Sequence, residues 1–164
     1  MTQVFVSIGS NINRKNNLSI ALKELKANFG NIKCSNIYQN PAVGFEGDDF
    51  YNLVAEINVT ITVHQLNKIL KSIEKIAGRN HQDPKFSART LDIDILLFAN
   101  ENYQPDLDIP RNEISKYLFI LQPLAEISPK TIHPILKKPI EQLFLELMPN
   151  KKLTAKIDLN KELK

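Results

Sequence analysis

The run Arg89-Thr90-Leu91-Asp92-Ile93-Asp94-Ile95-Leu96-Leu97-Phe98 combines an apolar, β-rich segment with two carboxylates placed two residues apart. Side chains at positions i and i+2 of a strand point to the same face, so Asp92 and Asp94 are expected to converge while Ile93 enters a core. Two like charges in an interior need a compensating cation, and Mg²⁺, which prefers oxygen ligands, is the simplest candidate. Arg89 could instead neutralise the pair as a structural ion pair, and the run alone leaves both interpretations open.

Composition narrows the class of protein. The chain has 164 residues, one cysteine and a formal net charge of +3. This length fits a single domain over 1–164, with about 151–164 as a polar, loosely attached end. Cys34 is alone, which excludes an internal disulfide framework, and we expect a buried, inert thiol. No apolar segment approaches the roughly 20 residues of a membrane span, and the N-terminus lacks the features of a signal peptide, so we expect a cytoplasmic protein.

Periodicity and turn residues predict the order of elements. Strands are expected at 3–8, 32–38, 51–59 and in the acidic run, and helices at 14–29 and 62–77, the second opened by a Thr62 and Gln65 capping box. Residues 40–49 form a long loop, 100–111 are rich in turn residues, and shorter helices are expected at about 113–121 and 139–148. The order β-α-β-β-α-β predicts an α+β, ferredoxin-like fold: an antiparallel sheet with both helices on one face, plus C-terminal additions.

The residues before the acidic pair indicate phosphate chemistry. A basic cluster immediately precedes the pair and suits the joint binding of phosphate and metal; its members are Arg79, His81, Lys85 and Arg89. Phosphoryl-type transfer needs a metal, cationic side chains and an acceptor pocket. The chain has no G-x-x-x-x-G-K-[ST] loop, and 9–11 reads by itself as an ordinary strand-to-helix turn. No residue pairing indicates covalent catalysis, and neither His64 nor His133 is assigned a catalytic role.

The acidic run, extended to Ser87–Phe98, resembles the signature of the 6-hydroxymethyl-7,8-dihydropterin pyrophosphokinases of the folate pathway. The resemblance covers almost the whole chain, and its supporting segments are Ser7–Asn11, Tyr38–Gly44, Phe50–Asn52, Ile73-Glu74 with Gly78-Arg79, and Phe119–Leu124. It implies a ferredoxin-like enzyme that transfers the terminal pyrophosphoryl group of ATP to the hydroxymethyl oxygen of the pterin and releases AMP. Its expected partners are these small-molecule substrates, without nucleic acid or membrane, and we expect a monomer.

The resemblance also implies roles for individual residues. Asp92 and Asp94 would bind two Mg²⁺ ions, with Arg79 and Arg89 as the catalytic clamp on phosphate oxygens. The implied ATP-binding set is Glu74, Arg79, Lys85, Arg89, Ile95 and Arg111, and the implied pterin-binding set is Asn40, Pro41, Val43, Gly44, Phe50, Asn52 and Phe119. By pattern alone Phe119 would be a core residue, Asn52 a solvent-exposed one, and Phe50 either of the two.

Several positions depart from the family's usual pattern: Arg111 in place of histidine, Asn112 in place of an aromatic or aliphatic residue, Tyr117 and His81 in place of arginines, and Phe86 in place of tryptophan. We hypothesise that Arg111 compensates for the positive charge missing at Tyr117. Two other functions fit the pattern less well: a ferredoxin-like RNA-binding module that uses the basic segments, and a pterin-binding protein that has lost catalysis.

Overall fold

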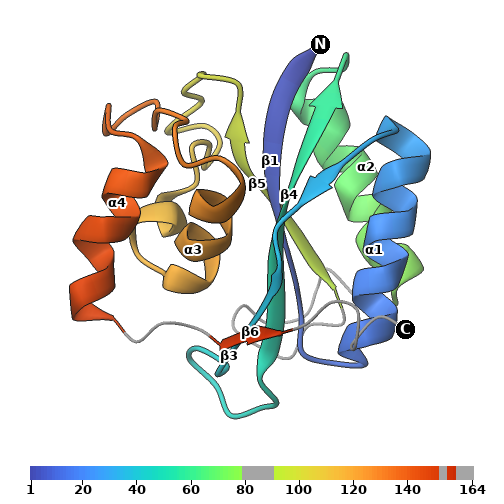
Figure 1. The fold of residues 1–164 in the computed structure, drawn as a ribbon. Helices are drawn as coiled ribbons and strands as arrows, with labels where there is room; N and C mark the ends of the chain where they lie inside the picture. Colours follow the sequence, from blue (N-terminus) through green and yellow to red (C-terminus); the bar gives the residue numbers. More distant parts are fainter. Residues whose placement is uncertain (79–90, 152–154, 158–164) are drawn as a thin grey trace.

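A computed structural model describes residues 1–78, 91–151 and 155–157 of the chain (Figure 1). The elements follow one another as β1 (Thr2–Ser10), α1 (Arg14–Phe29), β2 (Lys33–Cys34), β3 (Ile37–Asn40), β4 (Phe50–Val59), α2 (Val63–Ile76), β5 (Asp92–Phe98), η1 (Asn112–Ser115), α3 (Leu118–Ile127), α4 (Ile140–Leu147), η2 (Met148–Asn150) and β6 (Ala155–Ile157). No helix in these ranges is both long and apolar enough to cross a membrane.

The sheet has the strand order β5-β1-β4-β3-β6, with the short β2 also paired to β4, and its pairings are antiparallel. Helices α1 and α2 cover one face of this sheet, and α3 and α4 cover the other (Figure 1). The predicted α+β architecture with an antiparallel sheet is confirmed, and the C-terminal additions form a layer of their own.

Alternation along the strands supplies two separate cores. Ile8, Leu53 and Ile93 point toward α1 and α2 and belong to the first core. Phe5 and Val54 point the other way and pack with α3 and α4 in the second core. Because directly opposite residues of an antiparallel pair share a face, the residues in register with this second set also lie on the α3 and α4 side.

The two long helices agree with the sequence. Helix α1 has the predicted bounds, Arg14–Phe29. Helix α2 begins after Thr62, whose hydroxyl accepts from the Gln65 backbone N–H at 3.2 Å while the Gln65 side chain accepts from the Thr62 N–H at 2.9 Å. The predicted capping box is therefore confirmed.

Three segments differ from the sequence prediction. The strand expected over 32–38 is divided into β2 and β3 because Ser35 pairs with Val54 through both its backbone N–H and its hydroxyl. The helix expected at about 113–121 is a short 3-10 turn followed by α3, which runs to Ile127. Helix α3 is apolar on most of its surface, so helical spacing did not mark its bounds. The polar end contributes β6, which pairs with β3.

Candidate active site

Strand β5 carries the acidic pair at the edge of the sheet. Asp92 lies opposite Gly9 and Asp94 lies opposite Ser7, so both carboxylates project on the α3 and α4 face. Ile93 between them is buried in the first core. The predicted convergence of the two carboxylates is thus confirmed, and the site lies where β5 begins.

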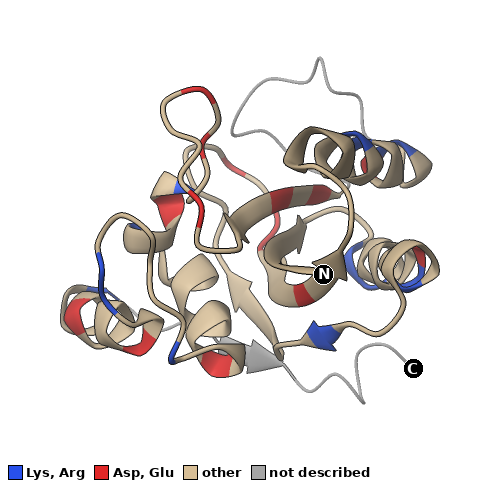
Figure 2. Cartoon of the chain, turned by 90° about the horizontal axis from the view of Figure 1, so that it is seen from above, with Lys and Arg blue, Asp and Glu red and all other residues tan. Residues whose placement is uncertain are grey.

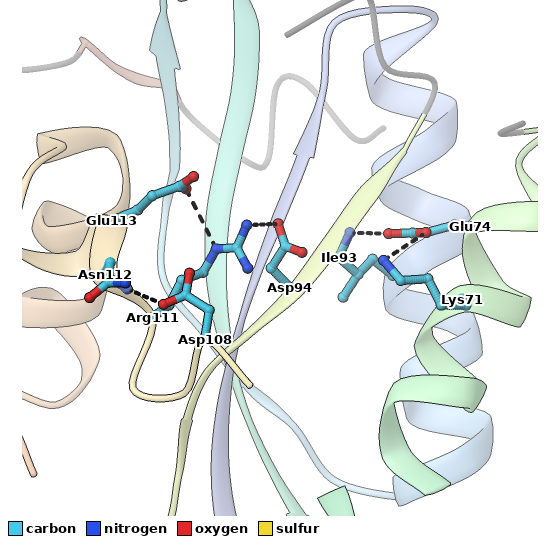
Figure 3. Close-up of polar contacts among 8 residues, drawn as sticks. All are labelled: Lys71, Glu74, Ile93, Asp94, Asp108, Arg111, Asn112 and Glu113. Atoms are coloured by element: carbon cyan, nitrogen blue, oxygen red, sulfur yellow. Dashed lines mark hydrogen bonds and ion pairs between the residues drawn. The ribbon is translucent and has the colours of Figure 1, made fainter. Parts of the chain in front are cut away.

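Arg111 reaches the acidic pair from the segment that follows β5 (Figure 3). Its guanidinium lies 3.3 Å from Asp94 Oδ2 and 3.5 Å from Glu113 Oε2, and its backbone N–H donates to the Leu96 carbonyl at 2.9 Å. Burial, and after it the neighbouring Asp92 carboxylate, raises the pKa of Asp94, and Arg111 opposes this shift. The folded protein therefore disfavours the ionised form of Asp94, and a bound cation would stabilise that form.

Glu74 supports the same strand from the opposite side (Figure 3). The side chain belongs to α2 and is fully buried. Its Oε1 accepts from the Ile93 backbone N–H at 2.8 Å, and its Oε2 lies 3.5 Å from Lys71 Nζ. β5 is the last strand in the sheet order, and this N–H is directed at α2 by its bond to Glu74. Glu74 thus fixes the backbone link between Asp92 and Asp94.

A pocket opens at the outer edge of β5, between Asp94 and the start of α2. Its lining residues are Val63, His64, Asn67, Asp94, Ile95, Leu107, Asp108, Ile109 and Arg111. The structure therefore brings together two residues of the implied ATP-binding set, Ile95 and Arg111, with one carboxylate of the acidic pair. It also adds His64, which the sequence placed only at a helix start, as a wall of this pocket.

Two asparagines form a second polar cluster on strands β3 and β4. The Asn52 carboxamide Nδ2 donates to Asn40 Oδ1, and Asn40 Nδ2 donates to the Pro41 carbonyl at 3.0 Å. Asn40 is buried and lies opposite Phe50 in the strand register. Four residues of the implied pterin-binding set are therefore neighbours. Asn52 is hydrogen-bonded to another side-chain amide, which differs from the simple solvent exposure that the pattern alone predicts.

The loop after β3 carries three residues of this set. Pro41, Val43 and Gly44 are exposed, and Phe45 meets Phe50 edge-on with the ring centroids 6.2 Å apart. The far end of the loop is tied to the start of α1, where Asn11 donates to the Asp48 carbonyl at 3.2 Å and Arg14 to the Asp49 carbonyl at 2.9 Å. These contacts hold the loop over the end of β1.

Phe119 is half-buried against the second core, which agrees in part with its reading as a core residue. Its ring stacks on Tyr117, with centroids 5.0 Å apart and planes 22° apart. Tyr117, which departs from the family's pattern, therefore packs against an aromatic residue of the implied pterin set. The ring stack could not be read from spacing, because i and i+2 do not share a helical face.

Three implied residues, Arg79, Lys85 and Arg89, lie outside the described residues, as do His81 and Phe86. Their roles, and the alternative in which Arg89 neutralises the acidic pair, stay predictions. The sequence missed the burial of Glu74, although its position four residues after Leu70 on the apolar face of α2 was a usable signal.

The donor set fits a magnesium site of a particular kind. The described residues hold no cluster of three or more histidine, cysteine or acidic side chains that could bind a metal. Mg²⁺ is commonly held by one or two carboxylates, with water and substrate phosphates completing its octahedron. Asp92 and Asp94 therefore suit a metal that arrives with a phosphate ligand, and not a permanently caged ion.

Comparisons with known proteins agree with this geometry. The family model described as 7,8-dihydro-6-hydroxymethylpterin-pyrophosphokinase (HPPK) matches residues 5–129. A protein of Aquifex aeolicus named 2-amino-4-hydroxy-6-hydroxymethyldihydropteridine pyrophosphokinase is 33% identical over 145 residues, which cover 87% of this chain and 90% of the relative. A Bacillus subtilis protein of the same name is 34% identical over 128 residues, covering 75% and 76%.

A solved structure of Plasmodium falciparum HPPK-DHPS has the same fold at 15% identity, with a TM-score of 0.70. The match covers 92% of this chain but only 44% of the Plasmodium chain, so this protein spans less than half of that chain's length. The sequence matches and the residues matched by the family model carry the assignment: this chain belongs to the 7,8-dihydro-6-hydroxymethylpterin-pyrophosphokinase family.

Proposed function

We propose that the protein transfers the β,γ-pyrophosphoryl group of MgATP to the hydroxymethyl oxygen of 6-hydroxymethyl-7,8-dihydropterin and releases AMP, as a step of folate biosynthesis. The observation that carries the proposal is the acidic pair, set between the pocket at the outer edge of β5 and the asparagine cluster of β3 and β4. Family membership and the names of the relatives support the same reaction.

The nucleotide occupies the pocket beside Asp94 in this proposal. Ile95 supplies an apolar wall, and Arg111 supplies positive charge next to the phosphates. Glu74 acts on this site through the Ile93 backbone. Arg79, Lys85 and Arg89 complete the cationic clamp, as the resemblance implies.

The pterin binds across the asparagine cluster. A flat ring with a hydrogen-bonding edge suits the Asn52 carboxamide, with Asn40 fixing the orientation of that amide. Phe50 and Phe119 contact the faces of the ring, and the loop residues Pro41, Val43 and Gly44 close over its edge.

The transfer then requires the protein to position the two substrates, and no side chain needs to form a covalent bond to them. The hydroxymethyl oxygen forms a bond to the β-phosphorus while the bond from that phosphorus to the bridging oxygen of the α-phosphate breaks, and AMP keeps the electron pair. Two Mg²⁺ ions bound by Asp92 and Asp94 would neutralise the phosphate charge. Arg111 holds phosphate oxygens in line, and the hydroxyl proton leaves to solvent, since no described side chain is an evident general base.

The proposal also covers the topology of the fold, the number of domains and the oligomeric state. The strand order β5-β1-β4-β3 with α1 and α2 on one face supports a ferredoxin-like topology. We further propose a single domain over 1–164 that works as a cytoplasmic monomer. Lys and Arg residues of the described chain are spread over helices, loops and one strand and form no single stripe, which disfavours the RNA-binding alternative (Figure 2).

The test is direct. The purified protein is incubated with ATP, Mg²⁺ and 6-hydroxymethyl-7,8-dihydropterin, and phosphorus NMR follows the products, with Asp94→Asn as the matched control. AMP and a pyrophosphate ester should appear in equal amounts with the wild type and not with the control. ADP would mean transfer of the γ-phosphoryl group and a wrong reaction, whereas pterin binding without product would favour the inactive binder.

A further inference from the structure

One row of residues crosses the sheet at the site and has a gap in its middle. Gly9 of the central strand β1 lies opposite Asp92 of β5 on one side and opposite Asn52 of β4 on the other. Directly opposite residues in antiparallel strands point to the same face, so the three positions form one line on the α3 and α4 side. Neighbouring strands lie about 4.8 Å apart, so the acidic residue and the amide stand roughly 10 Å from each other across the glycine.

The Asn52 carboxamide leans over this gap. A methyl group added at Gly9 would lie 2.6 Å from Asn52 Oδ1, closer than two such atoms can approach, and 3.8 Å from the Phe50 ring, an ordinary contact. The hydrogen bond from Asn52 Nδ2 to Asn40 Oδ1 fixes which end of the amide faces the glycine. The Asn52 carbonyl oxygen therefore lies in the space that a side chain at position 9 would fill.

We propose that Gly9 is a positioning residue of this enzyme: its missing side chain seats the Asn52 carboxamide and keeps open the path between the pterin and the acidic pair. The proposal rests on the proposed function, because it takes Asn52 as the reader of the pterin edge. The hydroxymethyl group has to extend from the ring over Asn52 toward Asp92, and the straight route across the sheet passes above Gly9.

The conformation of Gly9 does not explain the glycine. Gly30, Gly44 and Gly78 have a positive φ, whereas Gly9 lies inside a regular strand in which other residues fit the backbone. A glycine in a strand interior is destabilising by roughly 0.5–1 kcal/mol relative to alanine. The absent side chain allows the Asn52 carboxamide to approach the β1 backbone closely. The glycine is therefore explained by the arrangement of the site and not by the strand.

These contacts predict a separation of stability from binding. The atom that must move in Gly9→Ala is the end of a flexible side chain, so the variant should fold with a melting temperature close to that of the wild type. The displaced amide should weaken the binding of 6-hydroxymethylpterin by about tenfold or more, the range expected for a misplaced hydrogen-bonding group in a closed site. The KM for MgATP should change by less than about twofold, because the nucleotide pocket lies beside Asp94 and α2.

A double-mutant cycle tests the mechanism, with calorimetric titration of 6-hydroxymethylpterin into the wild type, Gly9→Ala, Asn52→Ala and the double variant. If the clash with Asn52 is the cause, Gly9→Ala should have little further effect on pterin affinity in the Asn52→Ala background. Equal, additive losses in both backgrounds would overturn the proposal, as would a Gly9→Ala protein with wild-type affinity.

NMR tests the contact between Gly9 and the Asn52 carboxamide independently of the reaction. The side-chain NH₂ signal of Asn52, assigned by its loss in Asn52→Ala, should shift strongly in ligand-free Gly9→Ala, and an unmoved signal would overturn the positioning role. A wild type that forms no AMP and binds no pterin would instead refute the proposed function and with it the pterin part of this inference.

Discussion

Glu74→Ala should destabilise the protein through the backbone of β5, the strand that carries the acidic pair. Glu74 is fully buried, and its Oε1 accepts from the Ile93 N–H at 2.8 Å, in the middle of the acidic pair. Alanine leaves this buried donor without its acceptor, which costs about 1–3 kcal/mol, and creates a cavity that adds to the loss. Removing a buried carboxylate offsets part of this effect, because its desolvation penalty also disappears.

The net loss should be about 2 kcal/mol, which corresponds to a fall of roughly 4–8 °C in melting temperature for a chain of this size. Glu74→Gln is the matched control, since its carbonyl oxygen can still accept from Ile93 while the charge paired with Lys71 at 3.5 Å is lost. That pair is partly exposed on the lysine side, so the glutamine variant should lose less than about 1 kcal/mol.

Urea unfolding followed by circular dichroism gives the free energies, and steady-state kinetics gives the catalytic effect. The alanine variant should lose turnover beyond what its folded fraction explains, because a loosened β5 no longer fixes the two carboxylates, whereas the glutamine variant should keep most of it. Equal stability of the alanine and glutamine variants, within about 0.5 kcal/mol, would refute the reasoning that the Ile93 hydrogen bond matters.

The remaining predictions concern charge. Asp92→Asn and Asp94→Asn should each lower turnover by at least about a thousandfold, and near-normal turnover would contradict the metal assignment. Metal-free Asp94→Asn should melt no lower than the wild type, because burial and the neighbouring Asp92 carboxylate raise the pKa of Asp94 and so disfavour its charge in the fold. Arg111→Ala should raise the KM for MgATP by about tenfold, with Arg111→Lys intermediate, and unchanged kinetics would end the idea that Arg111 replaces the charge missing at Tyr117. The neutral ring of His133 accepts from the backbone N–H groups of Ile135 and Leu136, and burial lowers its pKa, so its contribution to stability is complete above pH of about 6.5 and is lost as the pH falls through the lowered pKa. Melting curves between about pH 7 and 5 should show this loss for the wild type and a weaker one for His133→Asn, whose amide oxygen can accept the same bonds; equal slopes would contradict it.

The strands and long helices could be predicted because their apolar residues recur at the strand or helix period. The alternation over 51–59 and the helical spacing over 14–29 are local patterns, and the structure confirms both elements within one residue. The acidic run was predictable for the same reason, since two polar residues at strand spacing inside an apolar segment need a common partner. Local pattern therefore accounts for the elements whose buried residues follow a single strand or helix period.

Segments whose structure depends on distant partners were harder to predict. Ser35 interrupts the second strand because it pairs with Val54, nineteen residues away. The aromatic stack of Tyr117 on Phe119 and the seat of Asn52 on Gly9 depend on which strands and helices meet, and no spacing rule contains that information. The family resemblance identified Asn52 and Phe119 through their positions in the chain, but it gave no reason for Gly9 or Tyr117.

The contact between Arg111 and Asp94 shows how a loop completes this site. Arg111 follows Asp94 by seventeen positions, and the chain between them turns back through hydrogen bonds from Tyr103 to Ile109 and from Arg111 to Leu96. That last bond sets the Arg111 backbone beside β5, so its guanidinium meets Asp94 without a long reach. Burial works against the charge of Arg111, but the surrounding carboxylates, Asp94 first among them, outweigh it and raise its pKa. The cation is therefore permanent, and it balances only part of the charge on the acidic pair, so a metal brought in with phosphate would compensate the charge that remains.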